Sequence, residues 1–484
     1  MPDGTAPDRM TARRWVAGLV RASERWLPFA DAATAEVPLS RLLRLGLFQV
    51  SVGITFALLA GTLNRVMIVE LGVPASLVAL MLAIPLVFAP ARALVGYRSD
   101  TYRSALGWKR VPFIWFGTML QWGGLAIMPF ALILLSGDTN GTVVEAQIAS
   151  ALAFLLVGAG TYTVQTAGLA LATDLVPERA RPRAVALLYV LLLVGMVAGS
   201  LGYGRLLQDF SQVRLVGVIQ GSALVALALN VIALWKQEAR VPGARRKPHE
   251  PRPSFREAWR SFSAAPRVVR FLVALAFGTA AFGMQDVLLE PYGGQVLGLG
   301  VGATTELTAL MAGGSILAFL VAARSLERGL DAIRLAAFGT IVGVFGFAAI
   351  VFAAPLESAA VFRVGTALVG IGSGAFAVGM LTGAMALQDR DGHGLALGAW
   401  GAVQATAAGL AVASGGVLRD IITSSAERGV FGAAAPIPLG YSVVYHLEIA
   451  LLFATLVALG PLAVISRQAT PTPRRPFGLA DLPA

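Results

Sequence analysis

The chain has 484 residues, of which 56% are hydrophobic and only 13% are charged, and its mean hydropathy is +0.73. This composition excludes an ordinary soluble domain and indicates a protein of the lipid bilayer. The net charge of +11 does not indicate a nucleic-acid partner, because the basic residues lie between apolar runs rather than on a soluble face. The lack of cysteine excludes disulfides, thiolate metal sites and cysteine nucleophiles.

The first segment, residues 1–45, is rich in arginine and lacks the short apolar core and cleavage site of a signal peptide. We predict a cytoplasmic amphipathic segment. Trp15, Leu19, Trp26 and Leu27 would rest it on the membrane surface, and a merely solvated helix is the alternative.

Twelve apolar runs follow, and a spanning helix needs about 20 mostly apolar residues. They lie near 46–70, 75–95, 112–135, 147–172, 184–207, 214–235, 269–290, 303–323, 333–354, 360–387, 395–418 and 441–465.

A polar stretch rich in Arg and Pro, residues 236–267, separates the sixth run from the seventh. It divides the chain into a half at 46–235 and a half at 268–466, followed by a tail at 467–484. Short matches at corresponding places support duplication, such as Val78-Ala-Leu-Met81 and Thr308-Ala-Leu-Met311. The sequence therefore predicts an all-α membrane protein with twelve transmembrane helices in two six-helix halves, the major facilitator fold.

The gaps between runs differ in charge. The even-numbered gaps are rich in Lys and Arg, whereas the odd-numbered gaps are nearly bare of them. By the positive-inside rule, both termini and the even-numbered gaps, which include the linker at 236–267, are predicted to be cytoplasmic.

The gap between the second and third runs resembles the Gly-x-x-x-Asp-Arg-x-Gly-Arg-Arg loop of major facilitator proteins, with an insertion after the Asp. Its motif residues are Gly96, Asp100, Arg103, Gly107, Lys109 and Arg110. The resemblance implies that this cluster braces neighbouring helix ends on the cytoplasmic side. A topology signal without a bracing role is the alternative.

Charged residues inside a membrane are costly, at about 2.5–3.5 kcal/mol each, so they usually mark function or an internal pair. The first run ends with Asn64, Arg65 and Glu70, and the seventh contains Gln285, Asp286 and Glu290. We predict that these residues form an intramembrane polar cluster. Arg65 would pair with Asp286 or Glu290 across the interface of the halves, and a structural ion pair or an anchor near the helix ends is the alternative.

Neutral imidazole is a common ligand for metal centres, including the magnesium of a chlorophyll. Of the three histidines, His249 and His393 lie in polar loops, and His446 lies near the start of the last run. His446 is therefore the candidate pigment ligand, and a hydrogen-bonded interface residue is the alternative. No catalytic motif and no other metal site emerge, so an enzyme is not predicted.

Several longer stretches resemble the bacteriochlorophyll delivery family of the major facilitator superfamily, the PucC and LhaA light-harvesting assembly proteins of purple bacteria. They are 27–33, 44–50, 61–74, 104–114 and 285–294.

The resemblance implies a photosynthetic membrane protein that brings bacteriochlorophyll to newly inserted antenna polypeptides, or shields it beside them. Phe113, Trp115, Phe116, Trp122 and Phe130 in the third run could form a pigment surface or simply face lipid. Two alternatives stay open, namely a proton-coupled secondary transporter of a small solute or pigment precursor, and a scaffold that binds antenna polypeptides without pigment.

Overall fold

The structure is a computed structural model that describes residues 37–87, 108–136, 142–177, 181–238, 266–386, 395–432 and 436–468. The N-terminal helices are α2 (Leu39–Leu45), α3 (Leu47–Phe56), η2 (Ala57–Leu63), η3 (Val66–Glu70), α4 (Ala75–Val87), α6 (Val111–Leu135), α7 (Val143–Leu175), α8 (Arg181–Leu206) and α9 (Gln212–Leu234). The C-terminal helices are α11 (Pro266–Gly283), η5 (Met284–Val287), α12 (Leu289–Gln295), α13 (Val301–Glu327), α14 (Ala332–Ala353), α15 (Ala359–Ala386), α16 (Leu395–Glu427) and α17 (Pro436–Gln468).

The helices match the apolar runs predicted from the sequence. Among the described residues, eleven helical segments are long and apolar enough to cross a membrane, and Ala75–Leu86 forms a shorter apolar helix. The first of the eleven, Leu39–Glu70, joins α2, α3, η2 and η3. The all-α membrane fold predicted from the hydrophobic runs is therefore confirmed.

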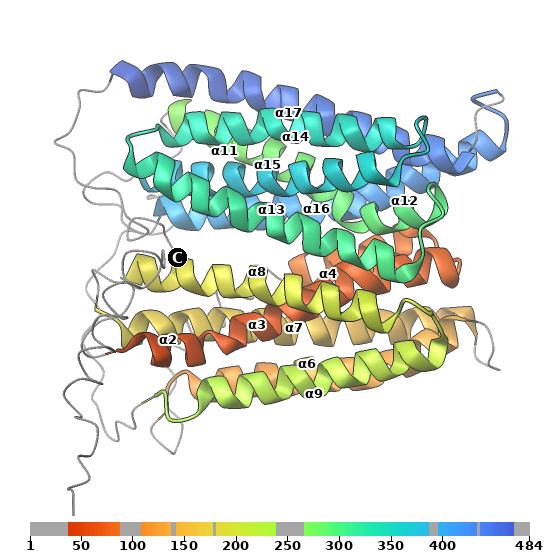
Figure 1. The fold of residues 1–484 in the computed structure, drawn as a ribbon, viewed down its shortest axis with the longest axis horizontal. Coiled ribbons are helices and arrows are strands. Elements are labelled where there is room, and N and C mark those ends of the chain that lie inside the picture. Colours follow the sequence, from red (N-terminus) through yellow and green to blue (C-terminus); the bar gives the residue numbers. More distant parts are fainter. Residues whose placement is uncertain are drawn as a thin grey trace, which may run out of the picture.

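The helices run roughly along one direction, with α2–α9 in the lower part of Figure 1 and α11–α17 in the upper part. Two helix pairs form the main contacts between these groups, α4 with α16 and α8 with α13. The exact boundaries of the halves remain a prediction, because residues 239–265 of the linker lie outside the described residues.

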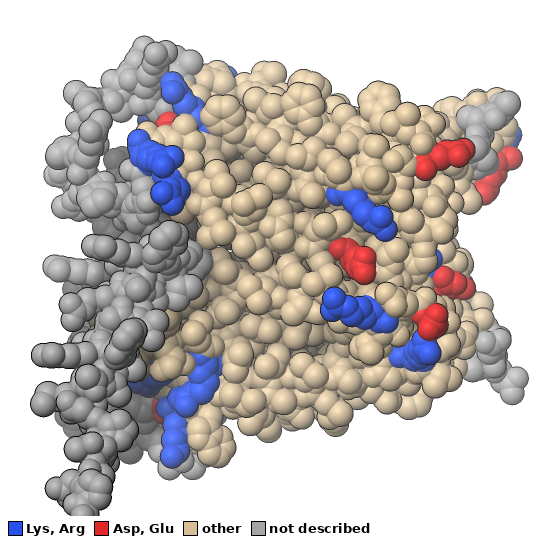
Figure 2. Space-filling view, viewed as in Figure 1, with Lys and Arg blue, Asp and Glu red and all other residues tan. Residues whose placement is uncertain are grey.

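The outer surface is mostly apolar, as a lipid solvent requires. Large hydrophobic side chains are exposed on many helices, among them Phe116, Phe130, Phe345 and Val457. The face shown in Figure 2 is accordingly mostly tan, with few charged side chains. The polar groups that concern function are therefore those buried between the helices and those at the helix ends.

Close helix packing depends on glycine where two backbones meet. In α14 a Cβ at Gly339 would lie 2.6 Å from the carbonyl oxygen of Gly372 in α15 and 2.6 Å from the backbone nitrogen of Phe376. Small residues at such crossings allow the close approach that drives association in lipid. The α14–α15 pair is thus fixed by backbone contact.

We expect Gly339→Ala to lower the melting temperature of the purified protein, since backbone atoms must move to admit the methyl group, at a cost of about 1–3 kcal/mol. Gly313→Ala in α13 is the control, because no heavy atom lies within 4 Å of its Cβ position. Equal melting temperatures for the two variants in detergent would contradict the close α14–α15 packing.

Candidate functional site

The first membrane segment changes its winding at the predicted polar residues. Two π-helical stretches, η2 and η3, flank Asn64 and Arg65. The N–H of Leu71 donates to the carbonyl of Val66, five residues back, at 3.0 Å. Such π turns are rare and often mark functional positions, because they redirect side chains that a regular helix would place elsewhere.

The first helix of the C-terminal group is irregular at the matching place. After α11, the 3-10 turn η5 carries Gln285 and Asp286, and α12 then begins at Leu289. Pro291 accounts for the interruption, because its ring would clash with the carbonyl of residue 287 in a continuous α-helix. Discontinuous helices in corresponding positions of the two halves are the usual location of binding sites in transporter folds.

Glu290 is the centre of a hydrogen-bonded cluster between the two groups of helices. Its Oε2 accepts a hydrogen bond from Nδ2 of Asn64 at 3.2 Å, and its Oε1 accepts one from Oγ1 of Thr308 in α13 at 2.5 Å. Asn64 also donates to the backbone carbonyl of Asp286 at 3.4 Å. Asn64 and Glu290 are fully or almost fully buried.

Gln285 and Asp286 contact each other, with the amide of Gln285 donating to Oδ1 of Asp286 at 2.6 Å. Asp286, Glu290 and Thr308 line a cavity of about 300 Å³ together with apolar residues of α3, α4, α7 and α16. The structure thus brings Asn64, Gln285, Asp286 and Glu290 to one place. Among the described residues, none of these acids forms an ion pair with a basic side chain.

The predicted pairing of Arg65 with Asp286 or Glu290 is wrong. Arg65 forms its ion pair with Glu70, five residues further along the same segment, and donates to the backbone carbonyl of Leu299 at 3.2 Å. The π turn of η3 brings residues 65 and 70 to the same side of the helix. Asn64, not Arg65, therefore contacts the acid of the other half.

Arg65 is nevertheless part of the contact between the two groups of helices. Its side chain is 5% exposed and packs against Gly294 of α12, where a Cβ would lie 3.2 Å from the guanidinium. The N–H of Ser76 in α4 donates to Oδ2 of Asp420 in α16 at 2.7 Å. Polar contacts thus join the two groups of helices near the ends of η3 and the start of α4.

Two further members of the buried polar set were not predicted. Thr308 had been noted only as part of an internal repeat. Glu448 of α17 is fully buried, and neither of its carboxyl oxygens has a hydrogen-bond partner among the described residues. Glu448 could have been found from the sequence, because it is an acid within an otherwise apolar run. Nothing in the sequence indicates which threonine faces Glu290.

The loop motif is described only in part, since Gly96, Asp100, Arg103 and Gly107 lie outside the described residues. The guanidinium Nε of Arg110 donates to Asp174 at the end of α7 at 2.9 Å, and Lys109 lies 3.5 Å from the same carboxylate. The backbone N–H groups of residues 109–111 donate to Glu238, which follows α9. These contacts join the ends of three helices.

His446 lies apart from the buried cluster, on the exposed face of α17. Its Nδ1 is 2.7 Å from the backbone carbonyl of Ser442, which can only accept, so Nδ1 carries the proton. In the described part of the chain, no hydrogen bond reaches Nε2. The same part contains no group of three or more His, Cys, Asp or Glu side chains that could hold a metal ion.

Solved structures with this fold are transporters. A bacterial homologue of the iron transporter ferroportin in the inward-facing state has a TM-score of 0.63 at 14% identity, over 87% of this chain and 98% of that one. This likeness concerns the fold alone. The chain is therefore an all-α membrane protein with the major facilitator fold.

The chain belongs to the PucC family. The family profile described as PUCC protein matches residues 62–467. An uncharacterized protein in the puhA-bchM intergenic region of Rhodobacter capsulatus is 52% identical over 479 residues, 98% of this chain and 99% of that protein. Protein PucC of Rhodovulum sulfidophilum is 55% identical over 403 residues, 82% of this chain and 89% of that protein. The family resemblance predicted from the sequence is confirmed.

We expect Thr308→Val to destabilise the protein by about 1–3 kcal/mol, because Oε1 of buried Glu290 loses its hydrogen-bond donor. Thr366→Val is the matched control, since that buried hydroxyl donates only to Phe362 of its own helix, at 2.9 Å. Thermal unfolding in detergent measures both variants. A loss for Thr308→Val no larger than for Thr366→Val would contradict the role of this hydrogen bond.

Proposed function

We propose that the chain is a non-enzymatic assembly factor for light-harvesting antenna complexes. In this proposal it holds bacteriochlorophyll at its lipid-exposed surface and passes the pigment to antenna polypeptides in the membrane. Family membership supports the assembly role. The geometry of His446 is the observation that supports the pigment.

The imidazole of His446 has the arrangement that a magnesium ligand requires. Metal-ligating histidines almost always donate their second ring N–H to a carbonyl or carboxylate, which fixes the tautomer and the ring orientation. The carbonyl of Ser442 has this role, and the lone pair of Nε2 is left for a ligand. His446 lies four residues from the middle of the apolar span Ile437–Ala463, about 6 Å along the helix, and so at membrane depth.

The position on the outer face also suits the size of the cargo. Cavities that enclose drug-sized ligands have volumes of roughly 300–1,000 Å³. The central cavity, at about 300 Å³, is at the small end of that range, and a tetrapyrrole with a long hydrocarbon tail is larger than a drug. A pigment held at the lipid face needs no enclosing cavity.

The exposed aromatic residues of α6, which include Trp115, Phe116, Trp122 and Phe130, do not belong to the same site. Helix α6 lies at the bottom of Figure 1 and α17 at the top. These residues and His446 therefore lie on helices at opposite edges of the bundle in this view.

Antenna polypeptides are the proposed protein partners, and the proposed location is the bacterial inner membrane, in its intracytoplasmic photosynthetic part. Both termini and the basic linker at 236–267 would face the cytoplasm. A cargo at His446 would meet its clients within the bilayer, surrounded by membrane lipid.

We expect His446→Leu to lower the bacteriochlorophyll that co-purifies with the protein from a photosynthetic host by about tenfold or more, because the magnesium loses its ligand. Absorption spectra of extracted pigment, normalised to protein, give the ratio. Phe453→Leu is the control, since this residue is also exposed on α17 but offers no ligand atom.

Two outcomes would count against pigment binding at His446. One is unchanged pigment in His446→Leu. The other is that the protein without any substitution purifies without pigment but with bound antenna polypeptides, which would favour a scaffold.

The cavity with its acids favours one alternative, a proton-coupled transporter. Asp286 and Glu290 line the cavity between the two groups of helices, where carboxyl groups can couple proton movement to solute binding. An assembly factor that holds its pigment at the lipid-facing surface does not need proton transfer at these two carboxyl groups.

We therefore expect Glu290→Gln to leave antenna levels in cells essentially unchanged. Glutamine has the same size, keeps one oxygen to accept from Asn64, and has an amide N–H that can donate to the Thr308 hydroxyl. Near-infrared absorbance of isolated membranes measures those levels, with equal amounts of the two proteins verified by immunoblot. A loss of antenna as severe as in a deletion strain would favour the transporter.

A further inference from the structure

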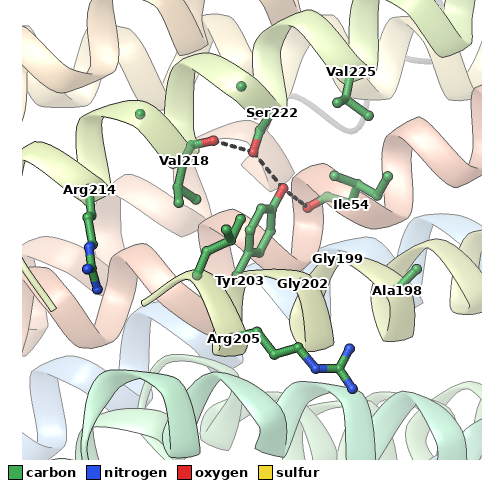
Figure 3. A pocket seen from close by; sticks show the side chains of 13 residues that line it. Ile54, Ala198, Gly199, Gly202, Tyr203, Arg205, Arg214, Val218, Ser222 and Val225 are labelled. Atoms are coloured by element: carbon green, nitrogen blue, oxygen red, sulfur yellow. Dashed lines mark hydrogen bonds between the residues drawn. The ribbon is translucent and has the colours of Figure 1, made fainter. Parts of the chain in front are cut away.

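A groove runs along the outer surface between α8 and α9. Each of these helices packs against α3, but they have few contacts with each other. The space between them has a volume of about 690 Å³, and Ile54 of α3 forms part of its floor. Figure 3 shows the α9 side chains on one side of this space and those of α8 on the other. We call it the α8–α9 groove.

Glycines keep the groove open. Gly202 of α8 and Gly217 and Gly221 of α9 line it, and no heavy atom lies within 4 Å of the Cβ position at any of the three. These glycines are therefore not explained by close helix packing, unlike Gly339 and Gly372. The space beside them is available to a molecule from the bilayer.

The two hydroxyl groups in the groove already have partners. Ser222 donates to the carbonyl of Val218 at 2.6 Å, and the hydroxyls of Tyr203 and Ser222 are 2.7 Å apart (Figure 3). The Tyr203 hydroxyl also contacts the backbone carbonyl of Ile54, at 3.4 Å. A ligand in the groove meets no unsatisfied polar group there, so a hydrocarbon chain suits the interior.

One end of the groove carries positive charge. Arg205 lies at the end of the α8 span and Arg214 near the start of the α9 span, so both are at the membrane surface. Arg214 forms an ion pair with exposed Asp209 at 3.2 Å.

Arg205 is exposed and has no hydrogen-bond or ion-pair partner among the described residues. Its guanidinium is turned away from α9 in Figure 3, and an exposed side chain changes rotamer within nanoseconds. Arg214 contacts Asp209 through Nη1 alone, so its Nε and Nη2 groups, like the guanidinium of Arg205, can donate to an anionic group at the groove entrance.

The length of the groove corresponds to one leaflet. From Arg214 to Val225 it follows eleven residues of α9, about 16 Å, roughly half of the 30 Å hydrocarbon core. A transmembrane helix would need the full thickness, and a neutral pigment would not need arginines at the entrance. We propose that the α8–α9 groove binds one anionic phospholipid, with its phosphate at Arg205 and Arg214 and an acyl chain along the glycines.

The test uses the full-length protein reconstituted in vesicles of phosphatidylglycerol and phosphatidylcholine in equal amounts. Native mass spectrometry after detergent release counts the retained lipids. We expect the unchanged protein to retain phosphatidylglycerol in preference to phosphatidylcholine. Arg205→Gln and Arg214→Gln should each lower this preference about fivefold, as expected for one basic side chain at an anionic headgroup.

Two further variants separate the charge from the groove itself. Gly221→Leu places a side chain where the acyl chain would lie, at a position with no heavy atom within 4 Å of the Cβ, and should remove the retained lipid. Asp209→Asn removes the acid beside Arg214 and should strengthen the preference for phosphatidylglycerol, which a damaged fold would not do.

The matched controls are Gly123→Leu, a glycine of α6 whose Cβ position is also open, and Arg363→Gln, an exposed arginine of α15. Both should retain lipid as the unchanged protein does. Equal retention of the two lipids by the unchanged protein would overturn the proposal. So would control variants that lose as much lipid as the groove variants. A protein purified from a photosynthetic host that retains bacteriochlorophyll, and loses it in Gly221→Leu, would also overturn the proposal.

Discussion

The two hydrogen bonds that Glu290 accepts are the interaction on which the centre of the structure depends. Asn64 and Thr308 donate them, so that one buried carboxyl joins the first, seventh and eighth membrane segments. Within the hydrocarbon core no water replaces a lost partner, so a buried polar group left without one is costly. The irregular winding of the two participating segments is consistent with this cost, since it directs Asn64 and Glu290 toward each other.

Both first helices of the two groups are interrupted, but by different means. The N-terminal one is underwound into π turns around Asn64, and the C-terminal one is broken by a 3-10 turn before Pro291. The duplication is therefore visible in the corresponding positions of the two interruptions, although the helix geometry at the two interruptions differs. Polar residues have been placed at the same depth in both groups, where a transporter would bind its substrate.

Much of the fold was predictable because hydrophobic runs of spanning length have few alternatives to helices in a bilayer. The residues of the polar cluster were largely predictable, since acids and amides in apolar segments are costly unless they form hydrogen bonds with one another. Its pairing was not predictable. Placing Arg65 opposite Glu290 assumed regular helices, and the π turn instead brings Arg65 to Glu70. The contribution of Thr308 and the hydrogen bond between His446 and Ser442 depend on side-chain directions that periodicity alone does not give.

If His446 on the outer face of α17 holds the pigment as proposed, its place has a kinetic consequence. A transporter of this fold must change between two global conformations in each cycle, so its rate is limited by that change. A cargo held on the outer face is in contact with the lipid phase throughout, and it can leave without any rearrangement of the helices. Its exchange would then be limited by two-dimensional diffusion of partners in the bilayer. The rate of transfer would rise with the density of antenna polypeptides around the protein.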